Sequence, residues 1–290
     1  MFLKLLCNPA AGRGRAHRHV WEAERYLRSR GAEVDTEEST SPDDLTRRAA
    51  ESSRAGYDRI IICGGDGSLN LAVREYELGR TPMALLPLGS GDDFANVCGI
   101  PRSLKKACDV AVDGRVRHVD VATANGYRYM GVAGLGFDSE VNEYANQNGR
   151  YLSGSLVYLY AIFRVLPKFK PHRVRISTGN GTREEEIMFA AVGNSRQYGG
   201  GIRIAPEARI DDHQLDVCIV HRTSIGQLLT TLPRAYNGSH VKKSFVETGR
   251  GLEFRFESEE PLKVFGDGEH LTETPVTFGL AERQLPIVVP

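Results

Sequence analysis

The sequence lacks the features that usually indicate a nucleic-acid partner. Its 37 lysines and arginines are balanced by 37 aspartates and glutamates, so the net charge gives no reason to expect nucleic-acid binding. No basic tract and no RNA-binding motif with interleaved aromatic residues occurs. Internal repeats and low-complexity segments are also missing. We therefore expect no nucleic-acid partner.

Long apolar runs are absent as well. The N-terminal stretch MFLKLLCNP is too short and too little apolar for a signal peptide. The longest apolar segment, 152–166, is interrupted by Ser153, Ser155 and Arg164, and no run reaches the length of a membrane span. We expect a soluble cytoplasmic protein that can still contact a membrane from its surface.

Cysteine is scarce, and its spacing shows no pairing motif. The five cysteines are scattered, odd in number and form no CxxC pair; they are Cys7, Cys63, Cys98, Cys108 and Cys218. Three of them lie in apolar runs, which predicts reduced thiols in a core rather than disulfides or metal ligands.

The first part of the chain alternates strand and helix patterns. Its 290 residues suffice for one large domain or two ordinary ones, and 41% of them are apolar. Strands are expected at 3–7, 32–36, 59–63 and 83–86, and helices at 16–30, 43–54, 69–77 and 104–112. This alternation predicts a parallel sheet with helices on its faces, so ligands bind beyond the C-terminal ends of the strands.

After about residue 115 short strand candidates follow one another. They are 116–123, 128–133, 173–178, 187–192, 214–220, 252–257, 262–265 and 276–278, interrupted by helical stretches only at 156–166 and 224–236. We therefore predict an α/β protein with an N-terminal parallel-sheet nucleotide-binding domain (1–121) and a mainly antiparallel, β-rich second domain (122–290). The extreme C-terminus is free to pack back on the first domain. The active site is expected in the interdomain cleft.

The most informative segment is Gly64–Asn70, which reads GGDGSLN and follows the strand expected at 59–63. Two adjacent glycines let backbone N–H groups approach a phosphate without interference from a Cβ atom. A helix from Leu69 would point its positive end at the same anion. Asp66 adds a carboxylate, which implies a magnesium ion between it and the phosphate. The alternative is a glycine turn in which Asp66 caps a helix.

The loops after the first two strands are polar too. Residues 8–15 read NPAAGRGR, whose small residues leave room for a nucleotide and whose Arg13 or Arg15 can meet a phosphate. An ordinary strand–helix turn is the alternative. Ser39, Thr40 and Ser41 precede Pro42, and they are either helix N-caps or phosphate contacts.

The loop after the fourth strand, residues 87–96, reads PLGSGDDFAN and again permits close approach at its glycines. Ser90 is a candidate contact to a phosphate or a sugar. Asp93 is a candidate for orienting a substrate hydroxyl or a hydrated cation.

Five motifs now stand in one order along the chain: NPAAG at 8–12, GGDGS at 64–68, GSGDDFA at 89–95, PEARIDDHQLD at 206–216 and DGE at 267–269. They resemble the NPxxG, GGDGT, GTxNDFA, P-x-A-x-x-D-D-G-x-L-D and DGE motifs of the soluble diacylglycerol kinase and lipid kinase superfamily. That superfamily shares its catalytic domain with sphingosine and ceramide kinases. GGDG alone also occurs in NAD kinases and phosphofructokinases, whereas the ordered set spans nearly the whole chain.

The resemblance implies an ATP-dependent kinase with Mg²⁺ as its cofactor, which transfers the γ-phosphate to a lipid hydroxyl. Diacylglycerol giving phosphatidic acid is the simplest reaction, with the lipid held by the second domain at a peripheral membrane surface. Some members of the superfamily are homodimers. The alternatives are a sphingoid or ceramide-like lipid kinase, an NAD kinase, and a catalytically silent nucleotide- or lipid-binding regulator.

The resemblance also assigns roles to residues of this chain. Those implied to bind ATP are Asn8, Pro9, Ala10, Ala11, Gly12, Ser39, Gly64, Gly65, Asp66, Gly67, Ser68, Leu69, Asn70 and Ser90. Asp66 would organise magnesium and water, and Glu269 would accept the proton of the lipid hydroxyl with help from Asp267. The alternative for the last two is a plain DG hairpin turn.

A structural metal ion is implied at Asp212 together with backbone oxygens of Arg209 and Gln214, an Asp-rich turn being the alternative. Three residues depart from the family motifs. Ser68 replaces a threonine and keeps its hydroxyl. Asp92 replaces an asparagine and adds a charge near the site. His213 replaces a turn glycine, where a positive φ angle would be strained.

Aromatic and basic residues gather between the third of these motifs, 89–95, and the fourth, 206–216. Tyr144 and the stretch 151–169 carry the aromatic residues, with Arg164, Lys168, Lys170 and Arg173 alongside. An aromatic helix face with a basic rim suits contact with anionic lipid. A helix packed into the core, with one solvated end, is the alternative.

Overall fold

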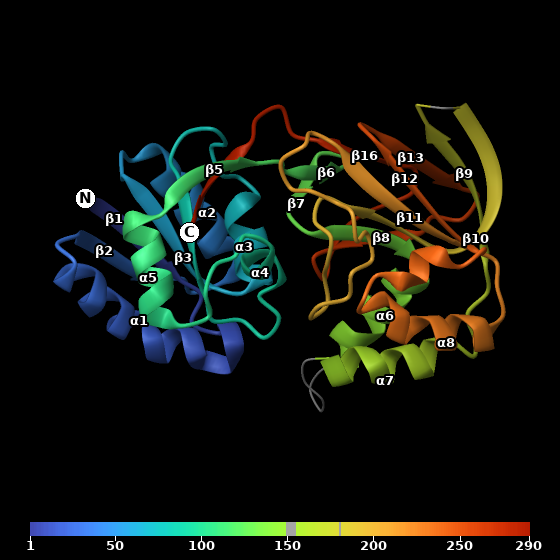
Figure 1. The fold of residues 1–290 in the computed structure, drawn as a ribbon, viewed down its shortest axis with the longest axis horizontal. Helices are drawn as coiled ribbons and strands as arrows, with labels where there is room; N and C mark the ends of the chain where they lie inside the picture. The colour runs from blue at the N-terminus through green and yellow to red at the C-terminus, as the bar shows by residue number, and fades with distance from the viewer. Residues whose placement is uncertain (149–154, 180) are drawn as a thin grey trace. The chain divides into compact units, whose positions relative to one another are not determined.

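The chain forms two compact units in this computed structural model, which describes residues 1–148, 155–179 and 181–290. One unit contains Met1–Val121 and Glu282–Pro290, and the other contains Ala122–Ala281. The last residues of the chain therefore belong to the first unit, where the C-terminus is marked in Figure 1.

The first unit is built on a six-stranded sheet in the order β2-β1-β3-β4-β17-β5. In sheet order the strands are β2 (Glu33–Glu38), β1 (Phe2–Cys7), β3 (Arg59–Gly64), β4 (Met83–Pro87), β17 (Leu285–Val289) and β5 (Arg115–Val119). Every pair is parallel except β17 with β5. The predicted parallel sheet is thus confirmed, and a C-terminal strand that the sequence reading missed completes it.

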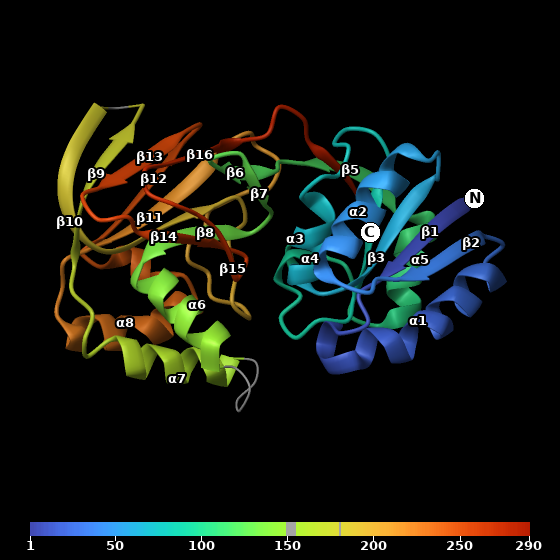
Figure 2. The same cartoon turned by 180° about the vertical axis from the view of Figure 1, so that it is seen from behind.

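Helices cover both faces of this sheet. They are α1 (Ala11–Ser29), α2 (Pro42–Arg54), α3 (Asp66–Val73), α4 (Asp93–Val97) and α5 (Leu104–Asp113). Helix α1 packs beside α5, and α2 packs beside α3 on the opposite face (Figure 1; Figure 2). The helix predicted at 69–77 begins and ends earlier than expected, because the chain already turns helical directly after the extended Gly65.

The second unit is built on an eleven-stranded sheet. Its main path is β15-β14-β8-β10-β9-β13-β16-β6-β7, and β11 pairs with β10 and β12 off this path. The strands are β6 (Ala122–Ala124), β7 (Tyr127–Tyr129), β8 (Val132–Gly136), β9 (His172–Thr178), β10 (Gly181–Gly193), β11 (Leu215–His221), β12 (Val246–Gly251), β13 (Phe254–Ser258), β14 (Lys263–Gly266), β15 (Glu269–Glu273) and β16 (Val276–Leu280). All their pairings are antiparallel, as predicted.

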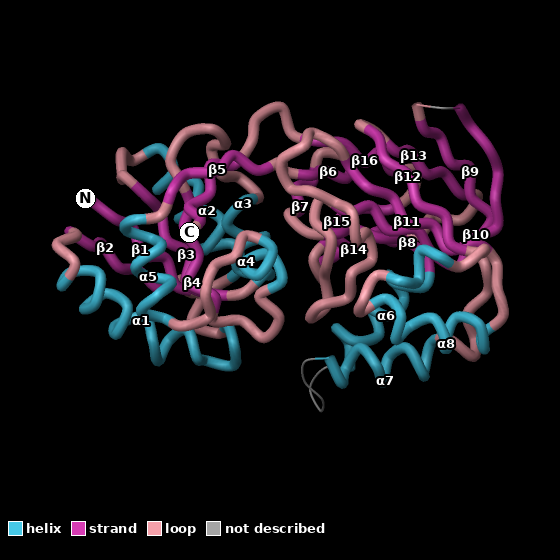
Figure 3. The backbone as a smooth tube through the Cα atoms, in the orientation of Figure 1, coloured by secondary structure: helices cyan, strands magenta, loops and turns pink. Residues whose placement is uncertain are grey.

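Three helices gather along one side of the second sheet (Figure 3). They are α6 (Phe137–Asn148), α7 (Ser155–Val165) and α8 (Ile225–Ala235), followed by the short 3₁₀ helix η1 (Ser239–Lys242). Their buried side chains, among them Val141, Ala161 and Leu228, share one core with Ala191 and Cys218 of the sheet. Helix α6 was not predicted, since only two helical stretches were expected after residue 115.

Two predicted strands are wrong in their extent. The strand expected at 116–123 is divided into β5 of the first unit and β6 of the second. The one expected at 128–133 is divided into β7 and β8, because the backbone at Met130 and Gly131 turns to meet Asp267. The five cysteines are buried free thiols, as predicted. Within the described residues, no helix combines the length and the apolarity that crossing a membrane requires.

Candidate functional site

Three glycine-rich loops meet at the C-terminal ends of β1, β3 and β4, which are neighbours in the sheet. The Asn8 side chain connects the first two loops, because its Nδ2 donates a hydrogen bond to Ser68 Oγ at 3.0 Å. Its Oδ1 accepts the backbone N–H of Ala10 at 3.2 Å. One amide therefore holds the loop after β1 in shape and fixes it to the first turn of α3.

The loops after β3 and β4 also lie very close together. A Cβ atom added to Gly65 would lie 2.7 Å from Gly89 Cα, so both positions must be glycine. Gly12 has φ of +58°, and its Cβ would lie 2.0 Å from the carbonyl oxygen of Leu88. Arg15 donates hydrogen bonds to the carbonyl oxygens of Leu88 and Gly89. Arg15 thus joins two loops, a role that the sequence reading did not assign.

Asp66 is the first residue of α3, yet its carboxylate binds the start of another helix. Its two oxygens accept the backbone N–H groups of Asp93 and Phe94, both at 2.9 Å. The helix-cap alternative therefore describes its contacts, with α4 as the capped helix. The same contacts fix the distance between the loops after β3 and β4. They leave the predicted role of Asp66 toward magnesium untested.

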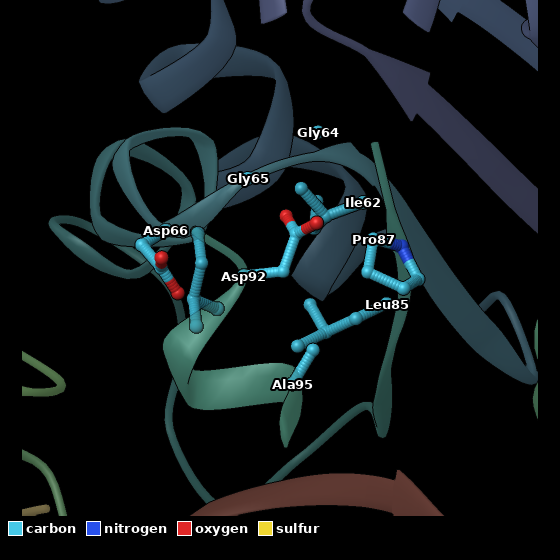
Figure 4. Close-up of a pocket in the computed structure, with 9 residues that line it drawn as sticks. Ile62, Gly64, Gly65, Asp66, Leu85, Pro87, Asp92 and Ala95 are labelled. Carbon is cyan, nitrogen blue, oxygen red and sulfur yellow. The ribbon is translucent and has the colours of Figure 1, made fainter. Parts of the chain in front are cut away.

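Asp92 and Asp66 both line a small pocket, and Figure 4 shows their side chains. It is buried, has φ of +55°, and accepts the backbone N–H of Gly89 at 2.8 Å. Burial, and then the neighbouring charge of Asp66, raise the pKa of Asp92 to about 6. The family's asparagine suits a left-handed backbone, and Asp92 keeps that conformation at the cost of a buried charge.

The remaining predicted nucleotide contacts differ in exposure. Asn70 is fully buried, and neither atom of its amide has a hydrogen-bond partner among the described residues. Leu69 is a core residue. The Ser39 hydroxyl donates a hydrogen bond to the carbonyl oxygen of Cys7, the last residue of β1, at 3.3 Å. The N-cap of α2 is Ser41, as one alternative predicted.

The structure therefore places most of the predicted ATP-binding residues in these loops or the first turns that follow them: Asn8, Pro9, Ala10, Ala11, Gly12, Gly64, Gly65, Asp66, Gly67, Ser68, Asn70 and Ser90. Gly67 and Ser90 are exposed. An added Cβ at Gly67 would meet no atom within 4 Å, so the surface of the first turn of α3 is open there. Backbone N–H groups at a helix start beside glycine loops suit a phosphate group.

In the second unit, Asp267 and Gly268 form the turn between β14 and β15, with φ of +51° and +88°. This is the hairpin turn that the sequence reading kept as an alternative. The carboxylate of Asp267 accepts the backbone N–H groups of Met130, Gly131 and Val132 at 2.8 to 3.1 Å. Asp267 is therefore a positioning residue that fixes this turn to the start of β8.

Glu269, the first residue of β15, differs from Asp267 in its surroundings. It is exposed, and in the described part of the chain its side chain has no hydrogen-bond or ion-pair partner. Its backbone is held by the hairpin, in which it pairs with Gly266. A carboxylate presented in this way is available to accept a proton from a bound alcohol.

The loop predicted to hold a structural metal ion lies before β11. Asp212 Oδ1 accepts the backbone N–H of Gln214 at 3.2 Å. His213, in the place of the family's glycine, has the positive φ of +57° that the sequence reading considered strained. The Nε atom of Arg209 lies 3.8 Å from Oδ1 of Asp211. The sequence reading missed Arg250 of β12, which lies 3.6 Å from Asp212 Oδ2, because nothing local connects two residues so far apart.

Comparison with known proteins agrees with this geometry. Residues 3–124 match the diacylglycerol kinase catalytic domain, and residues 131–289 match the YegS C-terminal NAD kinase beta sandwich-like domain. The diacylglycerol kinase of Mycobacterium tuberculosis (strain H37Rv) is 30% identical, over 98% of this chain and 94% of that protein. The diacylglycerol kinase of Bacillus subtilis (strain 168) is 26% identical, over 99% and 96%.

Solved structures agree in fold. A crystal structure from Bacillus anthracis strain Sterne is 25% identical, with a TM-score of 0.83 over 99% of this chain and 97% of the other. A diacylglycerol kinase structure from the same organism, 21% identical, has a TM-score of 0.74. The loops, the two sheets and these matches, which together span almost the full chain, show that the protein belongs to the diacylglycerol kinase-like family of lipid kinases.

Proposed function

We propose that the protein transfers the γ-phosphate of ATP to the hydroxyl of diacylglycerol, giving phosphatidic acid. The observation that carries the proposal is the junction of three glycine loops around Asn8, Gly65 and Gly89 at the start of α3, a helix N-terminus of the kind that suits a phosphate group. The relatives named diacylglycerol kinase support the choice of acceptor.

Phosphoryl transfer depends mainly on positioning and on neutralising charge. The first turn of α3 would bind the phosphates, and the fully buried, unpartnered amide of Asn70 behind it has room only for an internal water molecule as partner. Magnesium, when bound, would screen the phosphate charge. It needs one or two carboxylates besides phosphate oxygens and water, and Asp66 and Asp93 would supply them, with the Asp66 oxygens also accepting the N–H groups of Asp93 and Phe94. Glu269 would take the proton of the acceptor hydroxyl, while Asp267 holds the turn.

A transfer assay with γ-³²P-labelled ATP over a panel of acceptors tests the proposal. The panel is diacylglycerol, a sphingoid base, ceramide and NAD, each with and without Mg²⁺. We expect labelled phosphatidic acid as the main product, and only with the metal ion. Preferred labelling of a sphingoid base, ceramide or NAD would replace the acceptor, and no transfer to any of them would favour a regulator that binds without catalysis.

We also propose that α7 contacts the membrane that carries the lipid. Tyr160 and Phe163 are 45% and 57% exposed there, and Arg164 and Lys168 are exposed beside them. The opposite face of the helix is buried at Ala161. Core packing therefore coexists with an exposed aromatic and basic surface on α7 and the turn that follows it. Tyr151 and the side chain of Tyr158, which belong to the same predicted surface, lie outside the described residues.

A further inference from the structure

Arg250 occupies the neighbourhood in which the family resemblance implies a structural metal ion. Its Nη1 lies 3.6 Å from Asp212 Oδ2, and its Nε lies 3.4 Å from Asp216 Oδ1. Its Nη2 also donates a hydrogen bond to the carbonyl oxygen of Glu207 at 3.1 Å. One guanidinium on β12 thus contacts the beginning, the middle and the end of the loop 206–216.

Both oxygens of Asp212, the carboxylate that a divalent ion would use in this loop, already have partners. The N–H of Gln214 already engages Asp212 Oδ1, and the second oxygen of Asp212 faces Arg250. Over residues 1–148, 155–179 and 181–290, no group of three or more His, Cys, Asp or Glu side chains is arranged to hold a metal ion, so an ion in this loop would depend on Asp212 and backbone oxygens. His213 further departs from the family by placing an imidazole at the turn.

We propose that Arg250 closes this loop in place of a divalent cation. A guanidinium is always protonated and offers several N–H donors in a rigid plane, so it can serve two carboxylates and a carbonyl at once. A metal ion bound to the same carboxylates would be repelled by that charge, so the two cations compete for them. The side chain of Asp216 is only 13% exposed, and Arg250 is the partner of its Oδ1, whereas Oδ2 has no hydrogen-bond partner among the described residues. The inference does not depend on the kinase reaction.

Thermal unfolding without nucleotide tests it, in EDTA and in millimolar MgCl₂ or CaCl₂. The wild-type protein is expected to unfold at the same temperature in EDTA as in either metal salt. Arg250→Met should unfold several degrees lower in EDTA and recover part of that loss in Mg²⁺ or Ca²⁺, because the freed carboxylates then bind the ion. Arg250→Lys keeps the charge and should remain insensitive to the metal. Arg255→Met, which removes the exposed ion pair of Arg255 with Glu257, is the matched control.

A second substitution separates this loop from the nucleotide loops. Adding Asp212→Asn to Arg250→Met should abolish the recovery in Mg²⁺, which a metal effect elsewhere would not explain. The proposal is overturned if EDTA lowers the unfolding temperature of wild type and metal analysis finds about one ion per chain. It is equally overturned if Arg250→Met behaves like Arg255→Met. If Arg250→Met does not fold, the wild-type comparison and the metal analysis decide alone.

Discussion

Asp92 places an ionisable carboxyl group where the lipid kinase motif GTxNDFA has an asparagine, whose amide is neutral. Its pKa of about 6 in the folded chain lies above the ordinary value of 3.8. Between these two values the folded state holds a proton that the unfolded chain has released. The free energy of unfolding therefore falls as the pH rises from about 4 to 6.

Asp92→Asn keeps an acceptor for the N–H of Gly89 but removes the charge. We expect the variant to be more stable than wild type above pH 6, by up to about 3 kcal/mol, and to lose most of that advantage at pH 4. Urea unfolding of both proteins from pH 4 to pH 8 measures the difference. A difference that does not change with pH would show that Asp92 is not the titrating group.

Asp66 is expected to have two separable roles. Asp66→Ala should abolish phosphoryl transfer and also lower stability by about 1 to 2 kcal/mol, since the first N–H groups of α4 lose their acceptor. Activity and urea unfolding of the purified variant measure both effects. Near-normal turnover in a folded Asp66→Ala protein would contradict its assignment to the nucleotide site.

At the residue scale, the sequence predicted the glycines and missed the partners of the charged groups. Asp267 binds the amides of residues 130–132, and Arg250 binds Asp212 and Asp216. Such pairs depend on which strands become neighbours, and no local pattern encodes that. Gly65, in contrast, was predictable, because a strand that ends in two glycines already indicates a close approach.

The contact between the loops after β3 and β4 gives a prediction at the scale of elements. Gly65→Ala would place a Cβ atom 2.7 Å from Gly89 Cα, so one of the two loops must move. We expect a loss of about 1 to 3 kcal/mol in stability together with weaker ATP binding. Gly67→Ala is the control for stability, since its Cβ meets no atom within 4 Å. Equal unfolding midpoints for the two variants in urea would contradict the packing argument.

The segment that follows α7 gives a second prediction at this scale, because it carries Lys168 and Lys170. Lys168→Glu with Lys170→Glu should weaken binding to vesicles that contain anionic lipid, since each basic residue near such a surface contributes about 1 kcal/mol. Vesicle sedimentation at low salt measures this, with neutral vesicles as a reference. Lys105→Glu with Lys106→Glu, an equal charge change at exposed positions of α5, is the control. If both double variants bind as wild type does, α7 is not the contact surface.

Element types were easier to predict than element limits. The alternation of apolar runs and helical patterns indicated the parallel sheet, and the turns between short strands indicated the antiparallel one. Helix α6 was not predicted, because most residues between its buried apolar positions Phe137, Val141 and Ala145 are polar. Strand β12, VETGRG, has two glycines and alternating exposure, and its pairing with β11 rather than its own propensity makes it a strand.

At the scale of the whole molecule, the chain divides its chemistry between two units that do not coincide with two continuous segments. Strand β17 is buried along its whole length between β4 and β5, so the first unit includes the last nine residues, 282–290. The predicted location of the active site in an interdomain cleft stays a prediction. The division itself suggests that binding of ATP and activation of the acceptor can be altered separately.

Glu269→Gln tests that separation. The substitution keeps the size of the side chain and removes its ability to accept a proton, and general-base catalysis of this kind is typically worth roughly 100- to 10,000-fold in rate. The glycine loops all lie in the first unit, whereas Glu269 lies on β15 of the second. We therefore expect kcat to fall strongly while ATP affinity, measured by calorimetry, stays nearly unchanged. A parallel loss of ATP affinity would place Glu269 in the nucleotide site, and an unchanged kcat would mean that another carboxylate or the substrate itself handles the proton.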